Sequence, residues 1–163
     1  MLNKEHSYLL WEKGEYAIRR EMLANVRDEI ADIAVEHWEE IAGYKDTVPL
    51  DPLWEYFEDF EKTGRLFVFT LRENDKLIGY SVFWTGVHLH YRSLNVATND
   101  LLFVTKSKRH GRLGLQLIIE CEKYLKTRGV NKLTWHMKPH KSFAPLLERL
   151  GYKHEELIYG KLI

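Results

Sequence analysis

The sequence predicts an α/β domain with a mixed β-sheet. Two early segments repeat apolar residues as amphipathic helices do, and strand-like runs of β-branched and aromatic residues follow them. The second half then alternates strand-like and helix-like segments, an order typical of α/β folds. With 163 residues, 45% hydrophobic content and no linker rich in Pro, Gly or Ser, residues 1–163 are expected to form one domain.

The first two predicted elements are helices. Between about Met22 and Ile41 the apolar residues recur at three- and four-residue spacing, and Gly43 is a suitable end for this helix. A shorter helix follows from about Asp51, with Pro52 at its first position, and Gly64 stops it.

Three strands are expected next. Arg65–Arg72 and Lys76–Trp84 are rich in β-branched and aromatic residues, and the polar Glu73–Asp75 between them indicates a hairpin. Val96–Val104 reads as the third strand.

The remaining chain alternates helices and strands. An apolar stripe predicts a helix over about Arg112–Arg128, and alternation predicts a strand over Leu133–Met137. A short helix over about Ser142–Leu150 and a last strand over Glu156–Leu162 complete the order.

Composition excludes several classes of function. Lys plus Arg and Asp plus Glu both number 24, so the whole chain has no electrostatic reason to bind nucleic acid or an anionic membrane. No run approaches the roughly 20 apolar residues that span a bilayer, and the N-terminus lacks the apolar core of a signal peptide. The single Cys121 rules out an internal disulfide and fits a reducing compartment. We therefore expect a cytoplasmic protein.

The segment "KSKRHGRLG" predicts an anion site. A loop between a strand and a helix exposes the first unpaired amides of that helix, which favour bound anions. Glycines let the backbone approach a ligand closely. The alternative is a solvated basic helix start, and the dinucleotide and P-loop patterns are both absent. The cations and glycines concerned are Lys106, Lys108, Arg109, Arg112, Gly111 and Gly114.

These residues resemble a known family. Arg109-His-Gly-Arg-Leu-Gly114 resembles the acyl-CoA signature of the GNAT N-acetyltransferases, [QR]-x-x-G-x-[GA], although Arg112 stands at the first signature glycine and Gly111 lies one residue early. Phe143–Tyr152, "FAPLLERLGY", is similar to the family's late helix ending in E-K-x-G-[FY]. Together with "HWEEIAGYKD" and "LHYRS", the segment "HGRLGLQLI" resembles a branch common in tailed-phage genomes, which would place the protein in a host cytoplasm.

The resemblance implies a three-layer α/β/α fold whose sheet is splayed at its centre. Acetyl-CoA would lie between the strand ending at Val104 and the strand near Trp135. The resemblance further implies transfer of the acetyl group to a primary amine on a small molecule or a protein. The residues expected to contact the cofactor are Phe103, Val104 and Thr105 for the pantetheine, and Arg109, His110, Gly111, Arg112, Leu113 and Gly114 for the pyrophosphate.

Two residues are candidates for the proton acceptor. Asp100 occupies the strand region where many family members carry a carboxylate, and partial burial would suit it to act as a base. The alternative is that Asp100 bonds backbone amides at a strand irregularity. His90 is the rival, since its ordinary pKa suits proton transfer near neutrality. His88 and His90 have a spacing that permits metal ligation, but no third ligand is identifiable, so no metal site is predicted.

Three residues are candidates for binding the acceptor. Tyr91 follows the two histidines on a strand, and His37 and Glu40 lie together on the first helix, which often shapes the acceptor entrance in the family. A solvated helix face is the alternative for His37 and Glu40.

A second class of function stays open at this point. Many GNAT enzymes have a tyrosine before the E-K pair that protonates the leaving thiolate, and here Leu147 stands there, with Tyr152 and Tyr159 as candidate substitutes. The altered glycine and the missing tyrosine favour the alternative of a GNAT-fold binding or structural protein without turnover. A homodimer is compatible with the sequence, which identifies neither the acceptor nor the oligomeric state.

Overall fold

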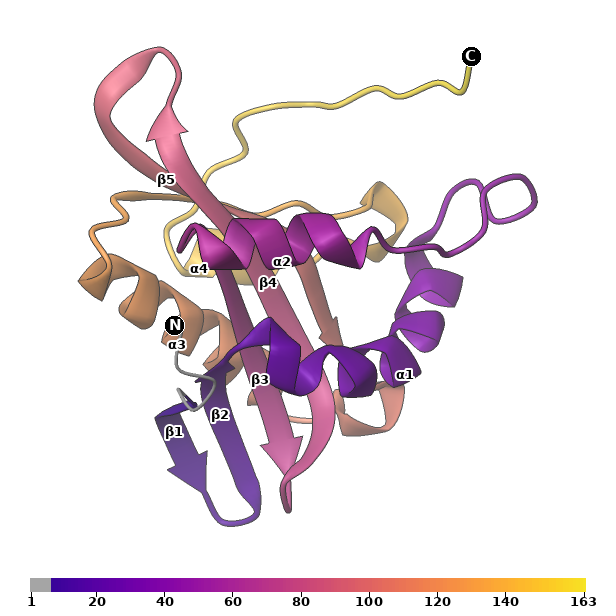
Figure 1. The fold of residues 1–163 in the computed structure, drawn as a ribbon, viewed down its shortest axis with the longest axis vertical. Helices are drawn as coiled ribbons and strands as arrows, with labels where there is room; N and C mark the ends of the chain where they lie inside the picture. Colours follow the sequence, from indigo (N-terminus) through magenta and orange to yellow (C-terminus); the bar gives the residue numbers. More distant parts are fainter. Residues whose placement is uncertain (1–6) are drawn as a thin grey trace.

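The computed structural model describes residues 7–163 and shows a six-stranded mixed β-sheet between two layers of helices (Figure 1). The strands lie in chain order; the first five are antiparallel to their neighbours, and the sixth is parallel to the fifth. The strands are β1 (Tyr8–Lys13), β2 (Tyr16–Glu21), β3 (Leu66–Glu73), β4 (Lys76–His88), β5 (Tyr91–Val104) and β6 (Lys132–Thr134). The predicted α/β/α architecture is confirmed.

The helices divide the core into two clusters, one on each face of the sheet. Leu23, Val26 and Ile30 of α1 pack against β3, β4 and β5, while Leu117 and Leu125 of α3 pack against the opposite face. α1 and α2 share the first face, and α3 and α4 lie on the second (Figure 1). The helices are α1 (Leu23–Ile41), α2 (Trp54–Lys62), α3 (Leu113–Thr127) and α4 (Ala144–Arg149), with 3-10 turns at Lys106–Lys108 and Pro139–Lys141.

The sequence prediction did not include the hairpin formed by β1 and β2. The feature that could have indicated this hairpin is Gly14, which lies between the runs "YLLWEK" and "YAIRRE" and adopts a left-handed φ of 60°. Two further elements differ in extent. α2 begins only at Trp54, after Pro52, and β4 and β5 extend into a long hairpin whose tip lies between His88 and Tyr91.

The predicted last strand over Glu156–Leu162 is wrong for this structure. Residues 153–163 lie in no helix or strand and are exposed. A strand needs a neighbouring backbone to satisfy its amides and carbonyls. In the part of the chain that the structure describes, no main-chain hydrogen bond joins residues 153–163 to another segment.

No helix within residues 7–163 is both long enough and apolar enough to cross a lipid bilayer.

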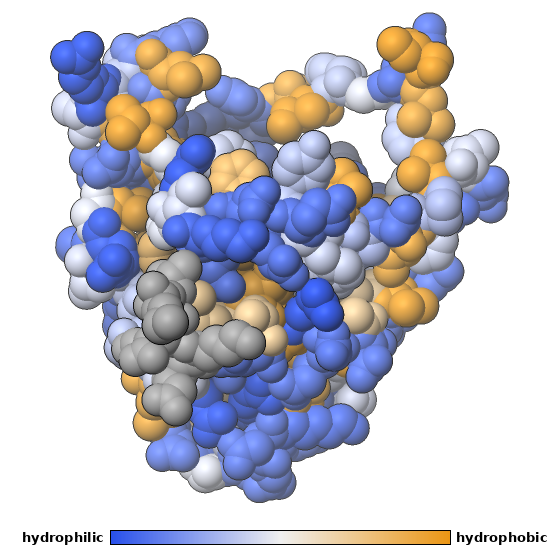
Figure 2. All heavy atoms as spheres, in the orientation of Figure 1, coloured by the Kyte–Doolittle hydropathy of each residue, from blue (hydrophilic) through white to orange (hydrophobic). Residues whose placement is uncertain are grey.

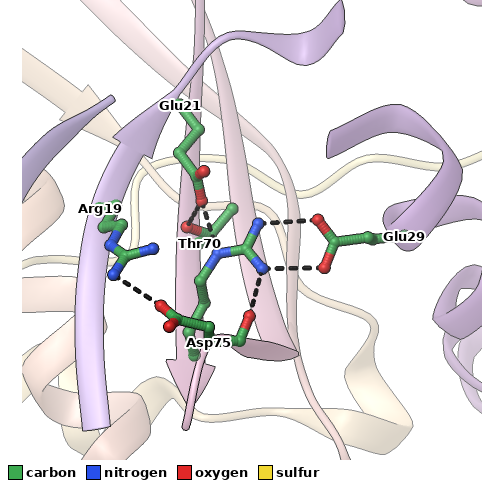
Figure 3. A network of polar contacts seen from close by, with 6 residues as sticks. Arg19, Glu21, Glu29, Thr70 and Asp75 are labelled. Atoms are coloured by element: carbon green, nitrogen blue, oxygen red, sulfur yellow. Dashed lines mark hydrogen bonds and ion pairs between the residues drawn. The ribbon is translucent and has the colours of Figure 1, made fainter. Parts of the chain in front are cut away.

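A buried arginine fastens α1 to the sheet. The Arg72 guanidinium on β3 donates through Nε to Glu21 of β2 (2.8 Å) and through both terminal nitrogens to Glu29 of α1 (2.8 and 2.9 Å). Thr70 also donates to Glu21, and the pKa of Glu29 is lowered chiefly by its hydrogen bonds from Arg72. Figure 3 shows Glu21, Glu29 and Asp75 converging from separate elements. The network therefore fixes α1 against β2 and β3.

We expect Arg72→Met to lower the free energy of unfolding by about 3 kcal/mol, because it leaves the buried Glu21 carboxylate without its charged partner. The matched control is Arg19→Met, which removes an ion pair to the exposed Asp75 and should cost less than about 1 kcal/mol. Denaturant unfolding of both variants checks this. Equal losses would show that the buried network does not hold α1.

Candidate functional site

The candidate site lies where the pairing between β5 and β6 ends. Their parallel pairing covers only Val96–Lys132, Ala97–Leu133 and Thr98–Thr134, and the last pair is joined by a side-chain hydrogen bond from Thr134 to Thr98 (3.1 Å). β5 continues to Val104, whereas β6 ends. Residues 99–104 therefore have no ladder partner on the β6 side, and such an open strand edge can hydrogen-bond an extended ligand.

A β-bulge at Asp100 lies at the point of parting. The β4–β5 register skips there, since Val82 faces Leu101 and Phe83 faces Asn99. The buried Asn99 side chain holds the irregularity, because its Nδ2 donates to Ser81 Oγ (3.0 Å) and to the carbonyls of Val82 (3.1 Å) and Leu101 (2.9 Å). Bulges bend a strand and redirect its side chains. Asp100 itself thus has no partner residue on β4.

Asp100 lines a small pocket on the α2 side of the sheet. The pocket has a volume of about 190 Å³ and otherwise apolar walls. These surroundings raise the pKa of the Asp100 carboxyl by desolvation, and the positive charge of His136 partly opposes that rise. The other lining residues are Tyr56, Phe57, Phe60, Leu66, Val82 and Trp84.

His136 is a neighbour that sequence reasoning missed. His136 follows the end of β6 by two residues and lies close enough to Asp100 for its charge to act on the Asp100 carboxyl. The sequence pattern gives no signal for this contact, because it depends on how β5 and the segment after β6 lie side by side.

The loop after β5 presents a run of free backbone donors. The Thr105 and Arg109 amides bond to Ile78 and Lys106, whereas within the described chain the amides of residues 110–115 donate to no protein acceptor. Gly111 has a left-handed φ of 100°, and a Cβ added at Gly114 would meet nothing within 4 Å. The start of α3 also has no side-chain cap. An uncapped helix start with an open glycine fits a bound phosphate.

The basic residues of this loop divide into two pairs. Lys108 binds Glu73 on β3 (2.5 Å), and Arg109 binds Glu40 on α1 (2.7 Å). Lys106 and Arg112 are exposed and form no ion pair within residues 7–163. Two cations therefore hold the loop in place, and two stay available for an anionic ligand.

Arg109 joins the loop to both α1 and β5. Its two terminal nitrogens donate to the two Glu40 oxygens, each at 2.7 Å, and its Nε donates to the Val104 carbonyl (2.7 Å). The guanidinium also lies over the Phe103 ring, 5.3 Å from its centre. These hydrogen bonds from Arg109, aided by Lys141 at 3.4 Å, lower the pKa of Glu40 to about 2. Arg109, predicted to contact the cofactor, thus binds protein groups through its side chain.

His37 lies inside the protein. It is 6% exposed, stacks on Phe103 with ring centres 4.8 Å apart, and shares a hydrogen bond between Nδ1 and the Tyr80 hydroxyl (2.8 Å). Burial lowers the pKa of His37 to about 4, so the ring is neutral near pH 7. His37 and Glu40 were predicted to bind the acceptor, but the structure places both in packing beneath the loop.

His90 and Tyr91 lie at the exposed tip of the β4–β5 hairpin. Asp100 lies nine residues further along β5 than Tyr91, roughly 30 Å at about 3.3 Å per residue. The prediction of His90 as a rival base for the same proton does not fit this geometry. Among the residues that the structure describes, no group of three or more His, Cys, Asp or Glu side chains is arranged to hold a metal ion.

Tyr152 and Tyr159, the candidate proton donors to the leaving thiolate, lie in different surroundings. The Tyr152 hydroxyl donates to Glu122 of α3 (2.8 Å), and burial raises its pKa above the ordinary value. Tyr159 is 90% exposed and Leu147 is buried. Neither tyrosine is presented as a ready proton donor at the opening.

Comparison with known proteins decides the family. A sequence profile described as "Acetyltransferase (GNAT) family" matches residues 27–152, which is more than half of the chain. The chain belongs to the GNAT acetyltransferase family. This match begins within α1 and includes the bulged β5, the loop and α4. No curated protein sequence matches the chain.

Solved structures share the GNAT fold. An aminoglycoside acetyltransferase from an uncultured soil metagenomic sample is 12% identical, with a TM-score of 0.70 over 91% of this chain and 97% of that chain. Glucosamine-6-phosphate N-acetyltransferase from Arabidopsis thaliana is 13% identical, with a TM-score of 0.69 over 91% and 99%. Ribosomal-protein-alanine N-acetyltransferase from Brucella melitensis is 15% identical, with a TM-score of 0.68 over 91% and 99%. At these identities the likeness establishes the fold alone.

We expect Gly114→Glu to reduce acetyl-CoA affinity at least about tenfold, because it places a carboxylate against the predicted phosphate position. The open space around Gly114 lets the protein fold with the larger side chain. Gly43→Glu is the matched control, since Gly43 is equally unobstructed but lies after α1. Calorimetric titration measures both, and unchanged affinity in Gly114→Glu would reject the loop as the phosphate site.

We expect Glu40→Gln to lower the free energy of unfolding by about 1–3 kcal/mol at pH 7, since it leaves Arg109 without its carboxylate while Arg109 keeps some access to water. The folded pKa of about 2 lies below the ordinary 4.5, so the stabilisation is present above pH 4.5 and is lost as pH falls toward 2. Thermal unfolding across this range should show the two proteins converging at low pH. A difference independent of pH would contradict the ion-pair account.

Proposed function

We propose that this GNAT protein is an acyl-CoA-dependent N-acyltransferase that moves an acetyl group from acetyl-CoA to a primary amine. One observation carries the proposal: the open edge of β5 leads directly into the run of free amides over residues 110–115. An extended amide-containing chain ending in phosphates matches both parts, because the strand edge can pair with its amides and the helix start can hold its phosphates.

The chain's own groups would hold the donor at two places. The open edge of β5 at Phe103 and Val104 would pair with the pantetheine, whereas the Thr105 amide, predicted to join them, already donates to the Ile78 carbonyl. The amides following Arg109 would hold the pyrophosphate, with Lys106 and Arg112 supplying charge. Acetyl-CoA supplies the activated thioester and a tolerable leaving group, since thiols have pKa values near 8.5. The reaction is therefore feasible without a tyrosine that protonates the leaving thiolate.

We infer that Asp100 accepts the proton of the acceptor amine. An amine that approaches as ammonium must lose a proton before its lone pair can attack a carbonyl carbon. Burial raises the pKa of the Asp100 carboxyl, so its carboxylate is a stronger base than that of an ordinary aspartate. The new C–N bond forms as the C–S bond breaks, and a backbone amide near Val104 stabilises the developing oxyanion.

The pocket beside Asp100 favours an amine acceptor. Tyr56, Phe57 and Trp84 supply aromatic walls around the single carboxylate. Aromatic faces and a carboxylate both attract a cationic ammonium. The volume of about 190 Å³ admits the amine end of a molecule rather than a whole drug-sized ligand. A small primary amine and a protein amine both fit this description. A cytoplasmic location, in a host cell if the chain is phage-encoded, belongs to the same proposal.

The second candidate is a GNAT-fold binding or structural protein without turnover. Arg112 at the first signature glycine and Leu147 in place of the late-helix tyrosine favour it. Acetyl-CoA binding together with acceptor-dependent thiol release supports the enzyme, whereas binding without thiol release across an amine screen supports this second candidate.

We expect Asp100→Asn to lower kcat by about 100-fold or more while acetyl-CoA affinity changes little, because only the proton acceptor is removed. The wild-type rate should fall as pH drops through the raised pKa of Asp100, since the protonated carboxyl cannot accept a proton, and the Asp100→Asn variant should lack this acidic limb. Thiol release against pH measures both effects. His90→Ala is the control, and loss of the limb in that variant alone would transfer the role to His90.

A further inference from the structure

A second pocket lies on the face of the sheet opposite the Asp100 pocket. Phe67 and Val130, which line it, belong to the core cluster beside α3, whereas Leu66 and Val82 of the Asp100 pocket belong to the cluster beside α1. Its volume of about 430 Å³ lies in the range typical of small-molecule sites. In Figure 1 the ends of α2 and α3 lie on one flank of the sheet beneath the β4–β5 hairpin, and Figure 2 shows both hydrophilic and hydrophobic residues on that flank.

The lining of this pocket combines two cations with apolar side chains. Arg65, just before β3, and Arg128, just after α3, both line it, and no Asp or Glu does. Phe67, Val87 and Val130 supply apolar walls. Within the described residues neither arginine forms an ion pair. Two positive charges that the protein does not compensate favour an anionic ligand.

Arg65 is held through one nitrogen and one face of its guanidinium. Its Nε donates to the Thr85 carbonyl (3.1 Å), and the guanidinium carbon lies 5.1 Å from the centre of the Phe60 ring. Its terminal nitrogens donate to no protein acceptor in residues 7–163, and a Cβ added at Gly86 would lie 3.4 Å from Nη2. The guanidinium is therefore fixed before any ligand binds, with its terminal N–H groups available. Phe60 also lines the Asp100 pocket, so Arg65 contacts a wall of that pocket too.

Two asparagines fix the turn that carries Arg128. The Asn95 side chain donates through Nδ2 to the Gly129 carbonyl (3.2 Å), and the Asn95 amide donates to Asn131 Oδ1 (2.8 Å). The Asn131 amide in turn donates to the Asn95 carbonyl (3.0 Å). This turn follows the C-terminus of α3, where a helix has partial negative charge. An anion in the pocket therefore depends on the arginines themselves, since the helix end alone would repel it.

We propose that this pocket binds a small organic phosphate, with the phosphate group between Arg65 and Arg128 and an apolar body against Phe67, Val87 and Val130. A phosphate monoester carries about −1.5 to −2 charges at pH 7, which matches two guanidiniums better than one carboxylate does. Guanidinium groups also bind phosphate oxygens through paired parallel hydrogen bonds. The site is separate from the opening between β5 and β6, so its occupant is neither the donor nor the acceptor of the proposed transfer.

The test titrates the full-length protein with phenyl phosphate and follows the amide resonances by NMR. Shifts are expected over residues 64–67, 85–87, 95 and 128–130. Three comparison probes should each bind at least about tenfold more weakly. Phenol lacks the phosphate, inorganic phosphate lacks the apolar ring, and benzoate carries a single negative charge.

Two variants test the arginines. Arg65→Gln and Arg128→Gln should each weaken phenyl phosphate binding at least about tenfold, because each removes one charged hydrogen-bonding partner. Arg128 is exposed and its side chain bonds to no described residue, so this variant should fold like the wild type even if Arg65→Gln disturbs the contact with Thr85. Arg149→Gln is the control, since Arg149 is exposed on α4 and its loss removes the same charge away from the pocket.

The same spectra separate this pocket from the loop over residues 110–115. Shifts confined to that loop would overturn the proposal, as would unchanged affinity in both arginine variants. Benzoate binding as tightly as phenyl phosphate would contradict the choice of a phosphate, and equal binding of inorganic phosphate would contradict the apolar half of the site. A protein that fails to bind acetyl-CoA would leave this site unaffected, because none of its residues belongs to the loop or to the open edge of β5.

Discussion

The site depends on one constraint: the parallel ladder between β5 and β6 ends at Thr98 and Thr134. Had it continued, β6 would occupy the edge of residues 99–104 and no extended ligand could pair with them. The bulge at Asp100 coincides with this end, and the buried Asn99 side chain supplies hydrogen bonds that the interrupted β4–β5 register loses there. The opening, the candidate base and the pocket beside it therefore arise from the same irregularity.

Electrostatics explain how a basic loop can lie at a helix start. Cations there oppose the helix dipole and require compensation. Carboxylates from other elements provide it: Glu40 of α1 binds Arg109, Glu73 of β3 binds Lys108, and Glu36 accepts the Lys106 amide (3.1 Å). The loop is therefore held by the fold before any ligand arrives. The neutral His37 ring stacks on Phe103, so an uncharged side chain packs against the end of β5.

Much of the fold could be predicted from the sequence because its elements carry strong local signals. Val26 and Ile30 are spaced as on one face of a helix, and this face is buried in the structure. The run "RLFVFTLR" is likewise buried as a strand. The loop over residues 109–114 was recognisable as the start of α3 because glycines and cations precede the apolar stripe of that helix. Its binding of phosphates stays a prediction. The expectation for Glu156–Leu162 failed because a strand pattern describes only a capacity to pair, and in the described chain residues 153–163 form no main-chain hydrogen bond to another segment.

The roles of individual charged residues were harder to predict, because they depend on contacts between distant segments. Arg109 and Glu40 are far apart in sequence, and only the packing of α1 against the end of β5 shows that they bind each other. The same holds for Asp100 and His136, which interact electrostatically just beyond the end of the parallel pairing of β5 and β6. His90 illustrates the opposite case, since a residue chemically suited to proton transfer lies at a hairpin tip distant from the opening.

The central claim is that the open edge of β5 and the free amides after Arg109 form one binding surface. The most direct measurement is amide resonance mapping of the full-length protein by NMR, with and without coenzyme A. The account predicts coupled shifts in two segments, residues 99–105 and 110–115, at the same ligand concentration. Shifts confined to other surfaces, or shifts in the loop without any along β5, would contradict it.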